Sequence, residues 1–209
     1  MRILIVMCLL APLLALAQPD VSIRTSHEAL ARQMLADVIA MDTSVIRKET
    51  PKMAAYLARH LREAGFGGDS ILTIDLGEDG TSLVVRYSGK NPQLQSIGFM
   101  AHMDVVPAFR KDWELDPFVL TEEGDYFIGR GTADNKAGVV SLVVTFMKLK
   151  VAGYVPERDL ILVLTSDEET GMVSIKHIAK NMADDLNMEY AINADALSGV
   201  LAPDGSVFG

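Results

Sequence analysis

Cysteine is almost missing from this sequence, because Cys8 is the only one among 209 residues. It lies inside an apolar leader, so a mature chain that begins at Gln18 contains no cysteine. Disulfide bonds are then excluded, whatever the redox compartment. Basic residues are also in short supply, since 19 lysines and arginines stand against 28 aspartates and glutamates. They form no cluster that could follow a phosphate backbone, which argues against nucleic acid as a partner.

A long apolar run is present only at the start of the chain. Ile3–Leu16 is almost unbroken, and Ala15-Leu16-Ala17 then has the small-x-small pattern of a cleavage site. The run is too short to span a bilayer core of about 30 Å comfortably. We therefore expect a signal peptide over 1–17, a secreted or periplasmic mature chain, and no stable membrane anchor after cleavage.

The rest of the sequence has enough apolar residues, 49% overall, for a sizeable core. A capping-box pair at Thr25 and Glu28 and an N-cap at Thr50 predict the starts of two helices. Strand and helix patterns then alternate, which predicts an α/β domain with a mixed, mostly parallel sheet sandwiched by helices. The expected strands are 71–76, 82–88, 96–101, 159–164 and 190–193, with a hairpin at 119–120 and 126–128 and helices at 137–150 and 172–182.

Four polar clusters lie at the ends of these predicted elements. His102 and Asp104 follow one strand, Asp167-Glu168-Glu169 follows another, and Asp195 follows a third, while Asp134 precedes a helix. Taken singly, each has an ordinary explanation as a surface pair, a helix start, a cap or a turn. In open α/β sheets, however, sites gather at the carboxyl ends of strands. The four equivalent placements therefore favour one shared site.

The residue types in these clusters suit zinc. Zinc accepts imidazole nitrogen and carboxylate oxygen, and a carboxylate can bridge two metal ions about 3.5–4 Å apart. Because Glu168 and Glu169 are adjacent, their side chains point in different directions, so one can hold metal while the other faces a metal-bound water as general base. The other histidines, His27, His60 and His177, fall on predicted helices and are interpreted as surface or packing residues.

Three segments resemble the metal motifs of the zinc exopeptidase family, which includes aminoacylase, glutamate carboxypeptidase, carnosinase-type dipeptidases and succinyl-diaminopimelate desuccinylase. They are GFMAHMDVVPA at 98–108, GRGTADNKAG at 129–138 and TSDEETG at 165–171. Their order and intervals also resemble those of the family. The resemblance spans Gly98 to Asp195 and implies the fold of that family's catalytic domain.

The resemblance also implies a role for each metal ligand. His102 and Asp195 would hold one zinc ion, and Glu169 would hold the other. Asp134 would bridge the two ions, with a cis peptide bond to Asn135. Co²⁺ or Mn²⁺ could take the place of zinc.

Two further residues would act beside these ligands. Asp104 would orient the imidazole of His102 and fix its tautomer. Glu168 would be the general base that accepts a proton from the water and later delivers it to the leaving amine. The implied activity is that of a metallopeptidase that hydrolyses an amide bond in a small peptide or an N-acyl amino acid.

The sequence departs from that family in length. Family members carry an inserted lid-like domain, often used for dimerisation, and a final histidine ligand near the C-terminus, and neither follows Gly209 here. We expect 18–209 to be the N-terminal portion of a di-zinc catalytic domain, inactive alone, whose longer parent could be a homodimer. The alternative that stays open is a non-catalytic metal-binding module. Asn135 replaces an aspartate common in the family, with little effect expected because that position is not a ligand.

Overall fold

A computed structural model describes residues 21–195, 200–201 and 207–208. The predicted signal peptide, 1–17, lies outside these residues and stays a prediction. Within the described part of the chain, no helix combines the length and the hydropathy that a membrane crossing requires.

The centre of the fold is a five-stranded sheet in the order β1-β2-β6-β3-β7. β3 pairs parallel with both β6 and β7, whereas β2 pairs antiparallel with β1 and β6. β2 therefore runs against the other four strands, which confirms the prediction of a mixed, mostly parallel sheet. The strands are β1 (Ile71–Asp75), β2 (Thr81–Tyr87), β3 (Ser96–His102), β6 (Leu160–Thr165) and β7 (Met188–Asn193).

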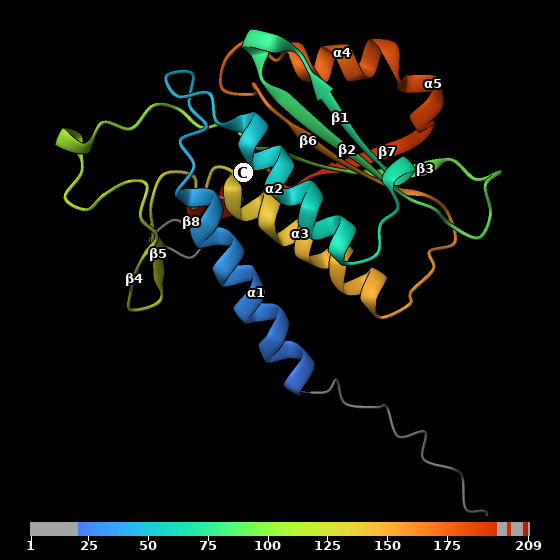
Figure 1. Ribbon diagram of the computed structural model, residues 1–209, viewed down its shortest axis with the longest axis horizontal. Helices are drawn as coiled ribbons and strands as arrows, with labels where there is room; N and C mark the ends of the chain where they lie inside the picture. The colour runs from blue at the N-terminus through green and yellow to red at the C-terminus, as the bar shows by residue number, and fades with distance from the viewer. Residues whose placement is uncertain (1–20, 196–199, 202–206, 209) are drawn as a thin grey trace, which may run out of the picture.

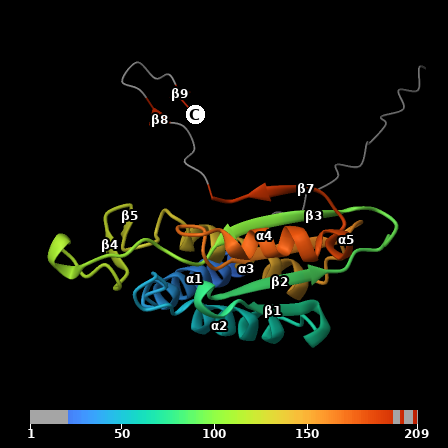
Figure 2. The ribbon, with the colours of Figure 1, turned by 90° about the horizontal axis from the view of Figure 1, so that it is seen from above.

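Helices lie on both faces of this sheet (Figures 1 and 2). One face is covered by α1 (Val21–Ile39), α2 (Thr50–Glu63) and α3 (Lys136–Val151). The opposite face is covered by α4 (Val173–Asn181) and α5 (Ala183–Leu186). The helices and strands thus form the three-layer α/β arrangement that the alternating sequence pattern predicts.

The strand pattern explains why two cores form. Successive side chains of a strand point to opposite faces. In β6, Leu162 and Leu164 pack with α1, α2 and α3, whereas Ile161 and Val163 pack with α4 and α5. All four are fully buried, as expected for a central strand covered on both faces.

Smaller elements surround the sheet. Two short hairpins are formed by β4 (Thr121–Glu123) with β5 (Tyr126–Ile128), and by β8 (Val200–Leu201) with β9 (Val207–Phe208). Among the described residues there are also three single turns of 3₁₀-helix: η1 (Gly68–Ser70), η2 (Gly77–Asp79) and η3 (Arg110–Asp112).

Two predicted helix caps and one predicted strand were wrong. α1 begins at Val21, so Thr25 lies inside the helix, because nothing between Val21 and Arg24 is a glycine or proline that would stop it. Glu49, not Thr50, precedes α2, because Thr50 is buried against Gly80 instead of capping the helix.

The third error concerns the first hairpin. Its strand β4 begins at Thr121, after the predicted 119–120. The pairing of Glu123 with Tyr126 leaves a two-residue loop that starts at Gly124, which has a φ of +59°. That loop sets the register of the hairpin and so places β4 directly before it.

Candidate metal centre

The sheet brings three of the four polar clusters to one edge. In the parallel pairing of β3 with β6, His102 lies opposite Thr165, and Asp167-Glu168-Glu169 begins two residues later. In the pairing of β3 with β7, Met100 lies opposite Asn193, two residues before Asp195. Parallel strands end at the same edge, so these clusters lie side by side.

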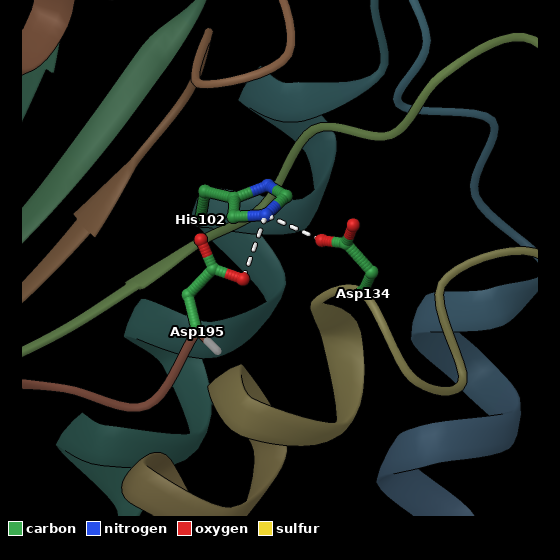
Figure 3. Close-up of side chains that lie close together, drawn as sticks. All are labelled: His102, Asp134 and Asp195. Carbon is green, nitrogen blue, oxygen red and sulfur yellow. Dashed lines mark hydrogen bonds and ion pairs between the residues drawn. The ribbon is translucent and has the colours of Figure 1, made fainter. Parts of the chain in front are cut away.

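Asp134 joins this edge from the segment that leads into α3 and completes a compact group with His102 and Asp195 (Figure 3). The Nε2 atom of His102 lies 2.8 Å from Oδ1 of Asp134 and 3.6 Å from Oδ1 of Asp195. One ligand atom from each residue lies within 4.8 Å of the other two. One imidazole nitrogen with two carboxylate oxygens is a donor set that could hold a metal ion.

The other nitrogen of His102 faces Asp104. Nδ1 lies 3.0 Å from the backbone carbonyl of Asp104 and 3.3 Å from its Oδ1 atom. Both residues are buried. A proton held on Nδ1 by these acceptors leaves Nε2 as the nitrogen available to a cation.

The charges around His102 favour its protonated form when no metal is bound. Burial alone lowers the pKa of the imidazole. The hydrogen bond and charge of Asp104, the charge of Asp195 and the hydrogen bond to Asp134 raise it, with a net pKa of about 9. The carboxylates around His102 therefore stabilise a positive charge at this position.

Asp104 also positions the two adjacent glutamates. Its carboxylate oxygens accept hydrogen bonds from the backbone N–H groups of Glu168 and Glu169, both at 3.0 Å. Asp167 holds the same turn from the other side, because its carboxylate accepts the N–H of Ser174 at 3.0 Å, in the first turn of α4. The turn is thus tied both to His102, through Asp104, and to α4.

Glu168 and Glu169 lie beside the compact group without belonging to it. Glu168 lines a recess of about 200 Å³ together with His102 and Asp195. Burial and then the negative charge of Asp134 raise the pKa of Glu169, against the opposing charge of His102. Glu169 therefore shares its electrostatic surroundings with Asp134, while its metal-binding role stays a prediction.

The peptide bond between Asp134 and Asn135 is cis, as the resemblance predicts. Asp134 exposes 62% of its side chain, whereas Asn135 is buried. The amide oxygen and nitrogen of Asn135 have no hydrogen-bond partner among the described residues. A Cβ atom at Gly138 would lie 2.0 Å from that amide oxygen, so the glycine gives Asn135 its space.

Sequence reasoning missed two residues near the site. It groups Asp167 with the glutamates but gives it no role, and it does not single out Lys136. Lys136 is 0% exposed, although lysine is rarely buried without partners. The signal that could have found it is a lysine inside the motif at 129–138 that begins a mostly apolar helix.

Comparison with protein families gives a match to this same region. Residues 98–207, more than half of the chain, match the sequence model of peptidase family M20/M25/M40. The matched segment contains all six residues of the candidate site.

Individual proteins that resemble this chain are also peptidases or related hydrolases by name. The β-Ala-His dipeptidase of Rattus norvegicus is 30% identical over 189 residues, which cover 82% of this chain and 38% of the rat protein. Aminoacylase-1 of Sus scrofa is 34% identical over 118 residues, covering 56% of this chain and 28% of the pig protein. The crystal structure of human carnosine dipeptidase 1 is similar with a TM-score of 0.73 and 23% identity, covering 85% of this chain and 41% of that chain. This chain therefore spans well under half the length of these relatives.

Proposed function

This chain belongs to peptidase family M20/M25/M40, and from that premise we propose that it supplies the metal-binding part of a hydrolase that cleaves an amide bond in a small peptide or an N-acyl amino acid. The observation that carries the proposal is the compact group of His102, Asp134 and Asp195 beside the Glu168–Glu169 turn. The names of its relatives, a β-Ala-His dipeptidase and an aminoacylase, support the substrate class.

We propose zinc as the metal, with Co²⁺ or Mn²⁺ as substitutes. One imidazole and two carboxylates fit a zinc site that keeps one position open. Asp134, whose side chain is 62% exposed, would also serve as a ligand of a second ion together with Glu169. A bound zinc ion would act as a Lewis acid on the scissile carbonyl and lower the pKa of water toward about 7.

Residues of the protein would position the metal ligands and transfer the proton. Asp104 keeps the Nδ1 proton of His102 in place and fixes the backbone of the two glutamates. Glu168, in the wall of the recess, would take the proton from the attacking water and pass it to the leaving amine. The buried surroundings of His102 and Asp104 would strengthen these interactions by excluding water.

A second candidate is a metal-binding module without catalysis. It is favoured by one observation: the compact group comprises His102, Asp134 and Asp195, and Glu169 lies outside it. His102, Asp134 and Asp195 supply three ligands for one zinc ion. Beyond Asp134, only Glu169 is proposed as a ligand of the second ion. This chain alone would therefore bind one zinc ion well and the second weakly. We expect negligible hydrolysis by the 209-residue chain alone.

The test uses the protein expressed from its complete reading frame, with β-alanyl-histidine and N-acetyl-methionine as substrates. We expect zinc-dependent hydrolysis that disappears after treatment with a chelator and returns with added zinc. Removal of the metal ligand by His102→Ala should abolish both zinc binding and hydrolysis. Zinc binding without hydrolysis of any dipeptide or acyl-amino acid would instead establish the metal-binding module.

We also propose export of the protein, on the evidence of the leader at 1–17. The test is N-terminal sequencing of the protein recovered from outside the cytoplasm. A start at Gln18 would support export, and an intact Met1 would contradict cleavage.

A further inference from the structure

We propose that the segment 41–43, which begins two residues after the end of α1, is a brace that sets the spacing of the metal ligands although it contributes none of them. It acts through two positioning residues, Lys136 and Thr43. This inference rests on the proposed function in one respect, because the residues that the brace positions are the proposed ligands of a metal ion. Its evidence, however, consists of contacts outside the compact group itself.

The first arm of the brace reaches the segment that carries Asp134. The side-chain amine of Lys136, two residues after Asp134, donates hydrogen bonds to the backbone carbonyls of Val38 and Met41, at 2.8 Å and 2.6 Å. The Val38 carbonyl also accepts the N–H of Met41 at 3.2 Å, and the Met41 carbonyl accepts the N–H of Thr43 at 3.0 Å, so Lys136 joins a hydrogen-bonded turn at the C-terminal end of α1. The side chain of Lys136 thereby fastens the start of α3 to the end of α1.

The path of the Lys136 side chain is closely defined. A Cβ atom at Gly131 would lie 2.9 Å from Cδ of Lys136 and 3.0 Å from its Cγ. Gly131 has a φ of +94°, and its carbonyl accepts the backbone N–H of Lys136 at 2.9 Å. Because glycine has no side chain, the side chain of Lys136 can pass Gly131 and reach the end of α1. The hydrogen bond between the backbones of Gly131 and Lys136 also closes the loop that contains Asp134.

The second arm reaches the segment that carries His102 and Asp104. The hydroxyl of Thr43 donates a hydrogen bond to the backbone carbonyl of Met103, which lies between them, at 2.7 Å. Thr43 and Met103 are both buried. Loss of this donor would leave a buried carbonyl unpaired, so the contact holds the backbone between His102 and Asp104 in one position.

The brace itself is held by hydrogen bonds that involve neither the side chain of Lys136 nor that of Thr43. The N–H of Asp42 donates to Oε2 of Glu49 at 2.8 Å, and the N–H of Glu49 donates back to the carbonyl of Asp42 at 3.2 Å. The Oδ1 atom of Asp42 also accepts the N–H of Ser44 at 3.1 Å. One fixed segment thus contacts both halves of the candidate site, and the 2.8 Å approach of His102 to Asp134 depends on it.

The experiment measures zinc affinity by competition with a chromophoric chelator, at a temperature at which circular dichroism shows each variant to be folded. Thr43→Val removes the hydroxyl and keeps the shape, Thr43→Ser restores the hydroxyl, and Lys136→Met removes the amine. Matched controls on α3 are Thr145→Val, which deletes a 2.7 Å hydroxyl bond to the carbonyl of Ser141, and Lys148→Met, at an exposed lysine.

We expect zinc affinity to fall about 10–100-fold in Thr43→Val and Lys136→Met, as for other residues that orient metal ligands. Thr43→Ser and both controls should bind zinc as the unchanged protein does. If Lys136→Met fails to fold, Thr43→Val with its serine rescue still decides the question. Unchanged zinc affinity in the folded variants would overturn the proposal, even if their melting temperatures fall.

A second measurement separates this proposal from the proposed function. If the unchanged protein binds no zinc, the proposed function fails, and the brace is judged on crystal structures of metal-free protein. The separation of His102 Nε2 from Asp134 Oδ1, 2.8 Å here, should exceed hydrogen-bonding distance in Lys136→Met and be retained in Lys148→Met. An unchanged separation in Lys136→Met would overturn the brace.

Discussion

The carboxylate of Asp104 accepts the backbone N–H of Glu169 at 3.0 Å, although 65 positions separate the two residues. Its other oxygen accepts the N–H of Glu168 and lies near Nδ1 of His102. One buried side chain therefore sets the relation between the histidine and both glutamates. The geometry of the site depends on a residue that need not touch a metal ion.

Asp104→Asn tests this relation. The amide has one acceptor oxygen in place of two and points N–H groups at a backbone N–H, so the turn at Glu168 and Glu169 should shift. We expect zinc affinity to fall about 10–100-fold, measured by chelator competition. Asp125→Asn, at an exposed hairpin position, is the control and should be neutral. Equal zinc affinity in both variants would show that Asp104 does not position the site.

Glu168→Gln tests the proposed general base. The amide keeps the shape of the side chain but cannot accept a proton, so turnover in the complete protein should fall about 10²–10⁴-fold while zinc stays bound. Hydrolysis and zinc content are measured on the same sample. The exposed Glu123→Gln should keep full turnover. Loss of zinc from Glu168→Gln would mean that Glu168 is a ligand and that its proposed role is wrong.

Zinc binding should depend on pH through His102. The metal-free imidazole has a pKa of about 9, so at pH 7 zinc must displace a proton from it. Apparent affinity should therefore rise with pH up to about 9 and then level off. Calorimetry at pH 7.5 in two buffers of different ionisation enthalpy should show about one proton released for each zinc ion bound at this site. No proton release at this pH would contradict the protonated state of His102.

The same pKa predicts how the stability of the metal-free fold depends on pH. Because the folded-state pKa is raised from 6.5 to about 9, the contribution of His102 is fully present below pH 6.5 and is lost as pH rises through 9. The urea midpoint of the metal-free protein should fall over that window. In His102→Asn the fall should be smaller, since the titrating group is gone. An equal fall in both proteins would assign the dependence to other groups.

Leu162→Ala tests the core beneath the site. Leu162 is fully buried in β6 among α1, α2 and α3, so its truncation should lower the free energy of unfolding by about 2–5 kcal/mol. Urea denaturation measures this change. Leu72→Ala on the edge strand β1, where Leu72 is half exposed, should cost far less. Equal losses at the two positions would contradict the central placement of β6.

The fold was predictable where one periodic pattern decided the outcome. The apolar run of β6 and the apolar spacing of α3 predict both ends of each element to within one residue. The starts of α1 and α2 were not predictable in this way. Thr50 has the chemistry of a cap, but its burial against Gly80 is a contact between distant segments, and this contact takes precedence over local preference.

The candidate site also has a part that the sequence predicts and a part that it does not. Polar residues that follow strand patterns are enough to predict that His102, Glu168 and Asp195 share one edge, because parallel strands end together. The contacts that hold these residues in position were not predictable in this way. The bonds from Asp104 to the glutamate turn and from Lys136 to the end of α1 join segments 64 or more positions apart. A pattern within one segment of the sequence does not predict contacts of this kind.

Our central claim is that His102, Asp134 and Asp195 hold one zinc ion. The most direct measurement is anomalous X-ray diffraction at the zinc edge from crystals of this chain grown with zinc. We predict a peak about 2.0–2.2 Å from Nε2 of His102 and from one carboxylate oxygen of each aspartate. The absence of a peak there, with zinc found instead at His27, His60 or His177, would contradict this claim.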